Sequence, residues 1–216
     1  MNGRNSNPFK VIKEAAVTWW DDWTNWVLIG FAWMVSWITI VLAPPATFGI
    51  YYVAEELIQG RSLGFRGMLE GGRRYFIKSW VWMLVNVVVV FLVVVNFQFY
   101  GGFEQDLAAI LQGVVGLIGI LWIAVQFYAL PYFMLQETKS LRMAWKNAFL
   151  TILASPFFSL VIYIAIILIL IPCFITIVPL MLGVQGLIAV IGCTAVNDRV
   201  TVFGIREREQ ESRDSN

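Results

Sequence analysis

The chain has 216 residues, of which 59% are hydrophobic and only 13% are charged, and its mean hydropathy is +0.75. Soluble domains carry roughly 25% charged residues, so this chain has too little charge to cover a surface that faces water. The formal net charge of +1 excludes a strong overall field that would attract nucleic acid. The composition therefore predicts an all-α integral membrane protein that forms a single membrane domain over residues 1–216.

Residues 1–22 precede the first long apolar run and are predicted to form an amphipathic helix at the membrane surface. Asn7 is suited to cap this helix and Pro8 to begin it. Lys10 and Lys13 would face anionic headgroups, as an interfacial helix requires. The alternative is a cytoplasmic helix that packs on the bundle. One face of the helix would carry Phe9, Ile12, Ala16, Trp19 and Trp23.

Four uncharged runs follow and predict a helical bundle over residues 23–197. A membrane helix needs about 20 apolar residues, so the second and third runs fit one span each and the fourth fits two. Pro44-Pro45 interrupts the first run and divides it into a span and a short return segment from Pro45 to Gln59. The total is six membrane segments, of which the second is short. The runs are Trp23–Ala54, Ser79–Phe103, Leu107–Gln136 and Asn147–Asn197.

The distribution of basic residues favours this six-segment arrangement. With outside turns at Pro44-Pro45, at 101–106 and at 172–179, all 15 Lys and Arg residues would lie on the cytoplasmic side. We therefore expect a multi-pass protein of the plasma (inner) membrane with both termini in the cytoplasm. The polar stretch 206–216 is predicted to be a flexible tail.

Ten tryptophans are present, and most lie near the predicted cytoplasmic boundaries, as in an aromatic belt. This group consists of Trp19, Trp20, Trp23, Trp26, Trp80, Trp82 and Trp145.

Small and weakly polar residues form stripes along the predicted spans, a pattern that suits close helix packing with interhelical hydrogen bonds. Three amides in these stripes also have a functional interpretation. Asn86 in the third span, with Gln112 and Gln126 in the fourth, would line a polar cavity. Neutral amides suit a polyol or sugar better than an ion, so the substrate would be a neutral polar solute.

Several chemistries are disfavoured by the residues that are missing from the spans. No ionisable side chain lies deep within a predicted span, which argues against proton-coupled transport, pumping and voltage sensing. The chain has no His, and no base lies near a candidate Ser or Cys nucleophile. We therefore expect a non-enzymatic protein with no metal and no cofactor.

Charge is concentrated in two predicted cytoplasmic segments, Arg61–Lys78 and Glu137–Lys146. These segments would dock a partner, and the first hypothesis is an accessory or scaffold subunit. The alternative is a six-helix solute-binding or facilitating transporter subunit. The candidate docking residues are Arg66, Arg73, Arg74, Lys139 and Arg142.

Two blocks of sequence resemble the YesL-like family of small bacterial membrane proteins of unknown activity. The first is Leu42-Ala43-Pro44-Pro45-Ala46-Thr47 followed by Tyr51-Tyr52-Val53, and the second is Tyr128-Ala129-Leu130-Pro131-Tyr132 followed by Trp145-Lys146-Asn147-Ala148 and Pro156. The resemblance implies a Pro/Thr/Ala turn after the first span and a tyrosine-containing return helix. It also implies a partner, a membrane transport complex of the ABC type that takes up carbohydrate. It assigns no functional residues.

Overall fold

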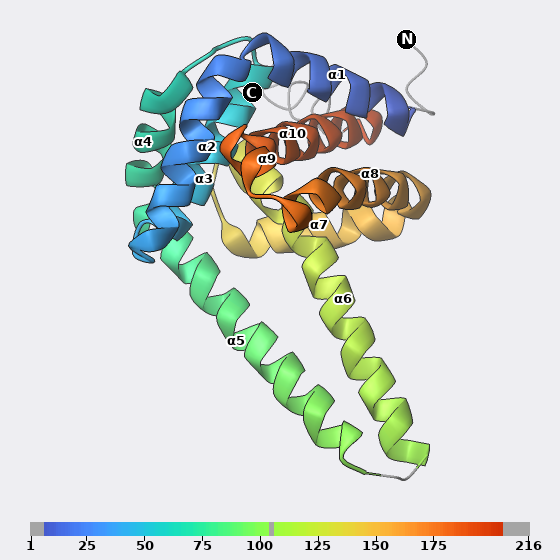
Figure 1. Cartoon of the computed structure of the whole chain (residues 1–216). Coiled ribbons are helices and arrows are strands. Elements are labelled where there is room, and N and C mark those ends of the chain that lie inside the picture. The colour runs from blue at the N-terminus through green and yellow to red at the C-terminus, as the bar shows by residue number, and fades with distance from the viewer. Residues whose placement is uncertain (1–6, 104–105, 205–216) are drawn as a thin grey trace.

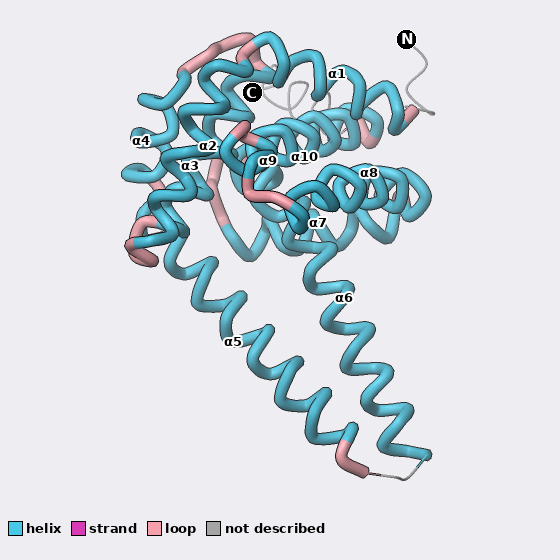
Figure 2. The backbone as a smooth tube through the Cα atoms, in the orientation of Figure 1, coloured by secondary structure: helices cyan, strands magenta, loops and turns pink. Residues whose placement is uncertain are grey.

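The structure is a computed structural model that describes residues 7–103 and 106–204, and every regular element in these ranges is a helix (Figures 1 and 2). The all-α prediction is therefore confirmed. The helices are α1 (Pro8–Asp21), α2 (Trp23–Ile38), α3 (Ala43–Ile58), α4 (Gly64–Arg74), α5 (Phe76–Gly101), α6 (Asp106–Leu135), α7 (Leu141–Ala154), α8 (Pro156–Ile175), α9 (Val178–Met181) and α10 (Val184–Val202).

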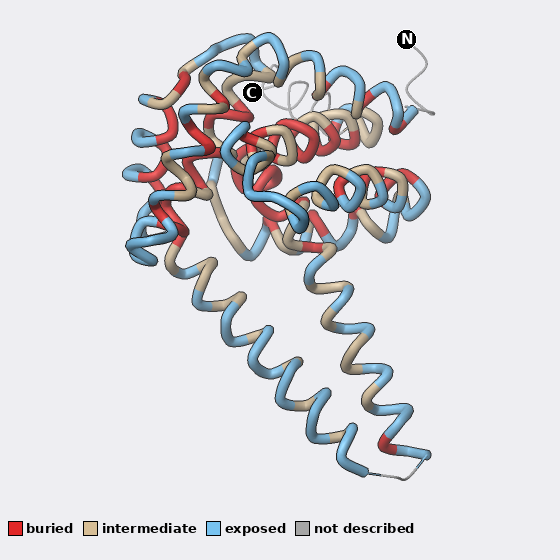
Figure 3. Tube along the Cα trace, in the orientation of Figure 1, coloured by how far each residue is buried: buried red, intermediate tan, exposed pale blue. Residues whose placement is uncertain are grey.

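A long hairpin of α5 and α6 projects from a body that the other helices form (Figure 1). The two helices have 26 and 30 residues, which corresponds to about 39 and 45 Å at a rise of about 1.5 Å per residue. Burial follows the same division (Figure 3), because α5 buries only Ser79, whereas α6 buries most of its last eleven residues inside the body.

Three helices are long and apolar enough to cross a membrane by length and composition, namely α5, α6 and α8. The mean hydropathies of their most apolar windows are 2.5, 2.3 and 3.0. The sequence predicted α5 and α6 within three residues of their observed ends. The prediction of a membrane protein therefore holds at this level.

Before residue 60, α3 matches the short return segment predicted from Pro45 to Gln59, whereas the first predicted span is shorter than expected. Helices α2 and α3 have 16 residues each, which is about 24 Å and less than the hydrocarbon core of about 30 Å. Their turn lies at residues 39–42, and the double proline belongs to the first turn of α3. Proline suits that position because its fixed φ is helical and its missing N–H would have no partner there.

The predicted sidedness of this region is wrong. Helix α4 packs antiparallel to α3, and a Cβ added to Gly72 would lie 3.0 Å from the carbonyl oxygen of Pro45. Arg73 follows Gly72 directly, so Arg73 and Pro45 lie on the same side of any membrane. The distribution of basic residues predicted the prolines outside and Arg73 with Arg74 inside. The six-segment arrangement built on that placement is not supported.

Glycines bring α3 and α4 into close contact. A Cβ on Gly71 would lie 2.6 Å from the Cβ of Tyr52, and a Cβ on Gly49 would lie 2.2 Å from the carbonyl oxygen of Met68. Glycine therefore lets the two backbones approach, as small residues do between membrane helices. This packing outweighs the low helix propensity of the four glycines in α4.

The fourth apolar run, predicted as two spans, forms more than two helices. Helix α7 ends at Ala154, and Pro156 begins α8, which is 20 residues long. Helix α10 follows the short α9 and contains a buried Arg199. It is not among the candidate spans.

Helix α1 forms where it was predicted, and it packs on the bundle. The side-chain oxygen of Asn7 accepts a hydrogen bond from the backbone N–H of Phe9 at 3.0 Å. Val11 and Ala15 are buried, and α1 contacts α10 and α8. The side chain of Phe9, predicted on the apolar face, is exposed. The predicted tail 206–216 lies outside the described residues.

Candidate functional site

Two of the three predicted amides meet where the hairpin joins the body. The side-chain oxygen of Gln126 on α6 accepts hydrogen bonds from the indole of Trp82 at 2.9 Å, the indole of Trp145 at 3.2 Å and the amide of Asn86 at 3.4 Å. The side-chain oxygen of Asn86 on α5 accepts a hydrogen bond from the indole of Trp122 at 3.0 Å. We call these five residues the amide cluster, and they connect α5, α6 and α7.

Gln112 does not belong to the amide cluster. Its amide donates to the carbonyl oxygen of Phe97 at 3.2 Å, near the tip of the hairpin. Fourteen residues separate Gln112 from Gln126 on the same helix, which is about 21 Å. The structure therefore brings Asn86 and Gln126 together and leaves Gln112 apart.

The indoles of the amide cluster were assigned by sequence to an aromatic belt, except for Trp122. The structure shows a second role, since three indole N–H groups donate to the two amides. A signal in the sequence was present: Trp82 precedes Asn86 by four residues, and Trp122 precedes Gln126 by four. That spacing places both members of each pair on one helix face.

One donor in the amide cluster has no partner among the described residues. The side-chain nitrogen of Gln126 is buried and makes no hydrogen bond. Rotating the amide would not satisfy it, because its nitrogen would then face three donors that now bind the oxygen. The free N–H of Gln126 could donate to an acceptor such as a hydroxyl oxygen. The three indoles of the amide cluster surround this amide and limit the space for such a group.

The candidate docking residues are distributed over two places. Arg74, at the end of α4, and Lys139, in the loop between α6 and α7, form one group with Glu55. Burial lowers the pKa of Lys139, while the charge of Glu55 raises it and the charge of Arg74 lowers it further. The Lys139 ammonium donates to the carbonyl oxygen of Met134.

The remaining candidates, Arg66, Arg73 and Arg142, are exposed. Sequence reasoning missed Lys78 as a member of the Lys139 group: its ammonium donates to the carbonyl oxygen of Lys139 at 2.8 Å and so fixes the α6–α7 loop against the start of α5.

A buried cation was also missed. The guanidinium of Arg199 on α10 lies 3.9 Å from the centre of the Phe158 ring on α8 and 2.6 Å from a carboxylate oxygen of Asp198. Stacking and pairing compensate for the loss of water around this charge. The residue therefore connects α10 to α8 inside the body.

A pocket of about 680 Å³ with a mixed polar and apolar lining lies between α6, α7 and α10. Its lining includes Tyr132, Gln136, Asn147 and Thr151. The hydroxyls of Tyr132 and Thr151 are hydrogen-bonded to each other, and the side-chain nitrogen of Gln136 is buried without a partner in the described part of the chain. Its volume is in the range of small-molecule sites.

Comparison with models of protein families finds no match, and comparisons with curated proteins and with solved structures find none either. The resemblance to the YesL-like family therefore depends on the two sequence blocks quoted above.

Proposed function

We propose that this chain is a non-enzymatic integral membrane protein that serves as an accessory or scaffold subunit of a membrane transport complex. The observation that carries the proposal is the α5–α6 hairpin. Ser79 is the one buried residue of α5, although the helix is strongly apolar. A surface of this size needs lipid or the membrane helices of a partner to cover it.

The basic residues support a direction of insertion. The sequence has no Lys or Arg from Ser79 to Thr138, so every basic residue belongs to the body or to the chain ends. Basic residues stay on the cytoplasmic side. In the proposed arrangement the body faces the cytoplasm and the hairpin crosses the plasma (inner) membrane. Two crossings return the chain to its starting side, which keeps both termini cytoplasmic.

Helix α8 has a different place in this arrangement. It runs across the directions of α5 and α6 in Figure 1, so the three helices do not cross a bilayer side by side. We assign α8 to the membrane surface, with Phe157, Leu160 and Ile164 in lipid, because these side chains are exposed. The resemblance to the YesL-like family adds carbohydrate uptake as the setting for the complex.

A cysteine-labelling experiment tests the insertion. Cysteines are placed at Gly102 or at Ser62 in a chain that carries Cys173→Ala and Cys193→Ala. A membrane-impermeant maleimide should label the Gly102→Cys chain in intact cells and the Ser62→Cys chain only after permeabilisation. Labelling at Ser62 in intact cells would refute the proposed direction.

The scaffold role is tested by photo-cross-linking in native membranes. A photoreactive residue at Val90 or Ile118, both exposed on the hairpin, should give an adduct with a membrane subunit of a transporter. A photoreactive residue at buried Ala129 is the control and should give none. Alanine at Arg66, Arg73 and Arg74 should lower co-purification of that subunit. Adducts with lipid alone, and unchanged co-purification, would count against a scaffold.

The second candidate is a solute-binding or facilitating transporter subunit for a neutral polar solute. The unpaired side-chain nitrogens of Gln126 and Gln136 and the pocket between α6, α7 and α10 favour it. Proteoliposomes that contain the full chain should then take up a labelled polyol or sugar, and Gln126→Leu should lower the rate. Absence of solute-dependent flux rejects this candidate.

A further inference from the structure

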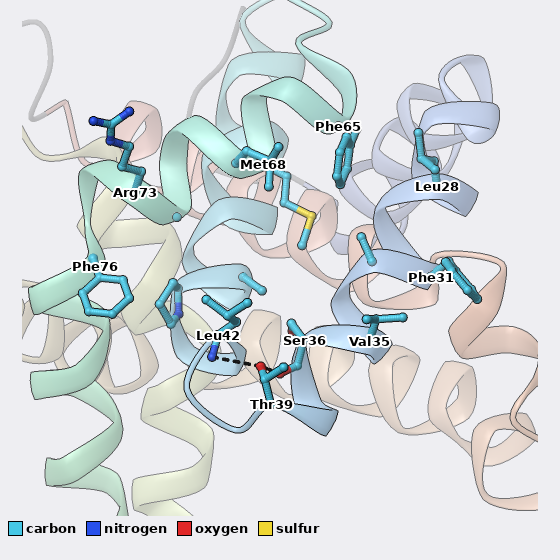
Figure 4. A pocket seen from close by; sticks show the side chains of 15 residues that line it. Leu28, Phe31, Val35, Ser36, Thr39, Leu42, Phe65, Met68, Arg73 and Phe76 are labelled. Atoms are coloured by element: carbon cyan, nitrogen blue, oxygen red, sulfur yellow. Dashed lines mark hydrogen bonds between the residues drawn. The ribbon is translucent and has the colours of Figure 1, made fainter.

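An apolar groove of about 590 Å³ runs between α2 and α4, with the start of α3 between them (Figure 4). Helix α2 contributes side chains three and four residues apart, among them Phe31 and Val35, and α4 contributes Phe65 and Leu69. Phe31 and Leu69 are 53% and 57% exposed, so the groove is open along its length.

The lining offers few groups that would bind a polar ligand. Its two hydroxyls are already used within α2, since Ser36 donates to the carbonyl oxygen of Trp33 at 2.6 Å and Thr39 donates to that of Ser36 at 2.8 Å. A peptide loop or a sugar would therefore lose hydrogen bonds to water without replacement. An alkyl chain needs none, and its burial is favourable.

A single charge lies at one end of the groove. Arg73 is the one charged residue of the lining, is exposed, and forms no salt bridge in the described part of the chain. Figure 4 shows Arg73 at the same end of the groove as Phe76, opposite Leu28 and Phe31, with its guanidinium pointing outward from the lining. The fork of N–H donors on a guanidinium matches two oxygens of a phosphate. Glu70 lies one turn earlier on α4, but the two positive charges of Arg73 and Arg74 leave the local net charge positive.

We propose that this groove binds one acyl chain of an anionic phospholipid and that Arg73 binds its phosphate. Phe76 closes the same end of the groove and begins α5. With the direction of insertion proposed above, the phosphate would lie near the membrane surface and the acyl chain would leave the bilayer to occupy the groove in the body. The binding itself does not depend on that direction or on the scaffold role.

The test uses the full chain in nanodiscs that contain phosphatidylglycerol with a diazirine in one acyl chain. After irradiation, mass spectrometry locates the labelled residues. Wild type should be labelled on α2 and α4, within 28–39 and 65–76. Arg73→Gln should lower this labelling about fivefold, the effect of one arginine near an anionic surface. The matched control is Arg66→Gln, because Arg66 is exposed on the same helix and does not line the groove.

Two further arms separate the charge from the groove. Phosphatidylcholine with the same acyl chains should label the groove several-fold less than phosphatidylglycerol does. Ala32→Phe fills the groove and should remove the label while Arg73 remains; if this variant does not fold, the other two arms still decide. Equal labelling of wild type and Arg73→Gln, or equal labelling by the two lipids, would overturn the proposal. Labelling confined to α5 and α6 would do so as well.

Discussion

Replacing Gln126 with leucine tests the structural role of the amide cluster. The side-chain oxygen of Gln126 accepts three hydrogen bonds, from the indoles of Trp82 and Trp145 and from the amide of Asn86. Leucine is apolar and of similar size, so it removes the acceptor without opening a large cavity. Two indole N–H groups then lose a partner inside the protein.

The expected loss of stability follows from the number of hydrogen bonds that the substitution removes. Hydrogen bonds between membrane helices contribute about 0.6 kcal/mol each on average and about 1.7 at most. Three bonds therefore give a loss of about 2 kcal/mol in the free energy of unfolding. For a chain of this length, that corresponds to a fall of roughly 4–8 °C in the melting temperature.

The assay compares the full chain and two variants in the same mild detergent. Circular dichroism gives the melting temperature, and tryptophan emission reports the surroundings of the indoles. Gln112→Leu is the control, because Gln112 makes one bond near the exposed hairpin tip, and it should cost about 0.6 kcal/mol. If Gln126→Leu melts at the temperature of Gln112→Leu, with unchanged emission, the cluster does not stabilise the junction.

Two other predictions concern the body. Gly71→Ala should destabilise the chain by about 1–3 kcal/mol in a denaturant titration, because its Cβ would lie 2.6 Å from the Cβ of Tyr52; Gly113→Ala, with nothing within 4 Å, should not. Burial lowers the pKa of Lys139 in the folded chain. Between that lowered pKa and the ordinary value of about 10.5, the unfolded chain therefore binds more protons than the folded chain. Wild-type stability relative to Lys139→Met should therefore rise with pH in this range, and a flat difference between the two melting series would contradict it.

The hairpin was predictable from sequence, whereas the arrangement of α2, α3 and α4 was not. Charges and turn residues bound α5 and α6 on both sides, so hydropathy alone locates them. The placement of α4 depends on how closely two backbones approach, and Gly49 and Gly71 decide that. Hydropathy treats these glycines as neutral, and the helix propensity scale treats them as unfavourable. Both measures therefore miss the contact that puts Arg73 beside Pro45.

The candidate site was predictable in part for a related reason. Amides in apolar spans are conspicuous, so Asn86 and Gln126 were identified, but Gln112 looks the same in sequence. Which amides come into contact depends on their positions along the hairpin axis. Trp82 and Trp145 were assigned to the membrane boundary, and the structure places both indoles at the junction of the hairpin with the body. Their indole N–H groups turn inward because the two amides offer acceptors there.

Most of the polar contacts described for the hairpin lie at its junction with the body, although Gln112 also donates to the carbonyl oxygen of Phe97 near the tip. At the junction, five side chains of the amide cluster connect α5, α6 and α7. Farther out, α5 and α6 meet through glycines, and a Cβ on Gly119 would lie 2.8 Å from the side chain of Val93. Contacts of this kind fix the helix spacing but leave the outer faces free for a partner. If the hairpin is a scaffold, bulky substitutions at Gly119 should separate α5 from α6. Bulky substitutions at the exposed Ile118, one residue away, should leave the hairpin intact and interfere only with binding of a partner.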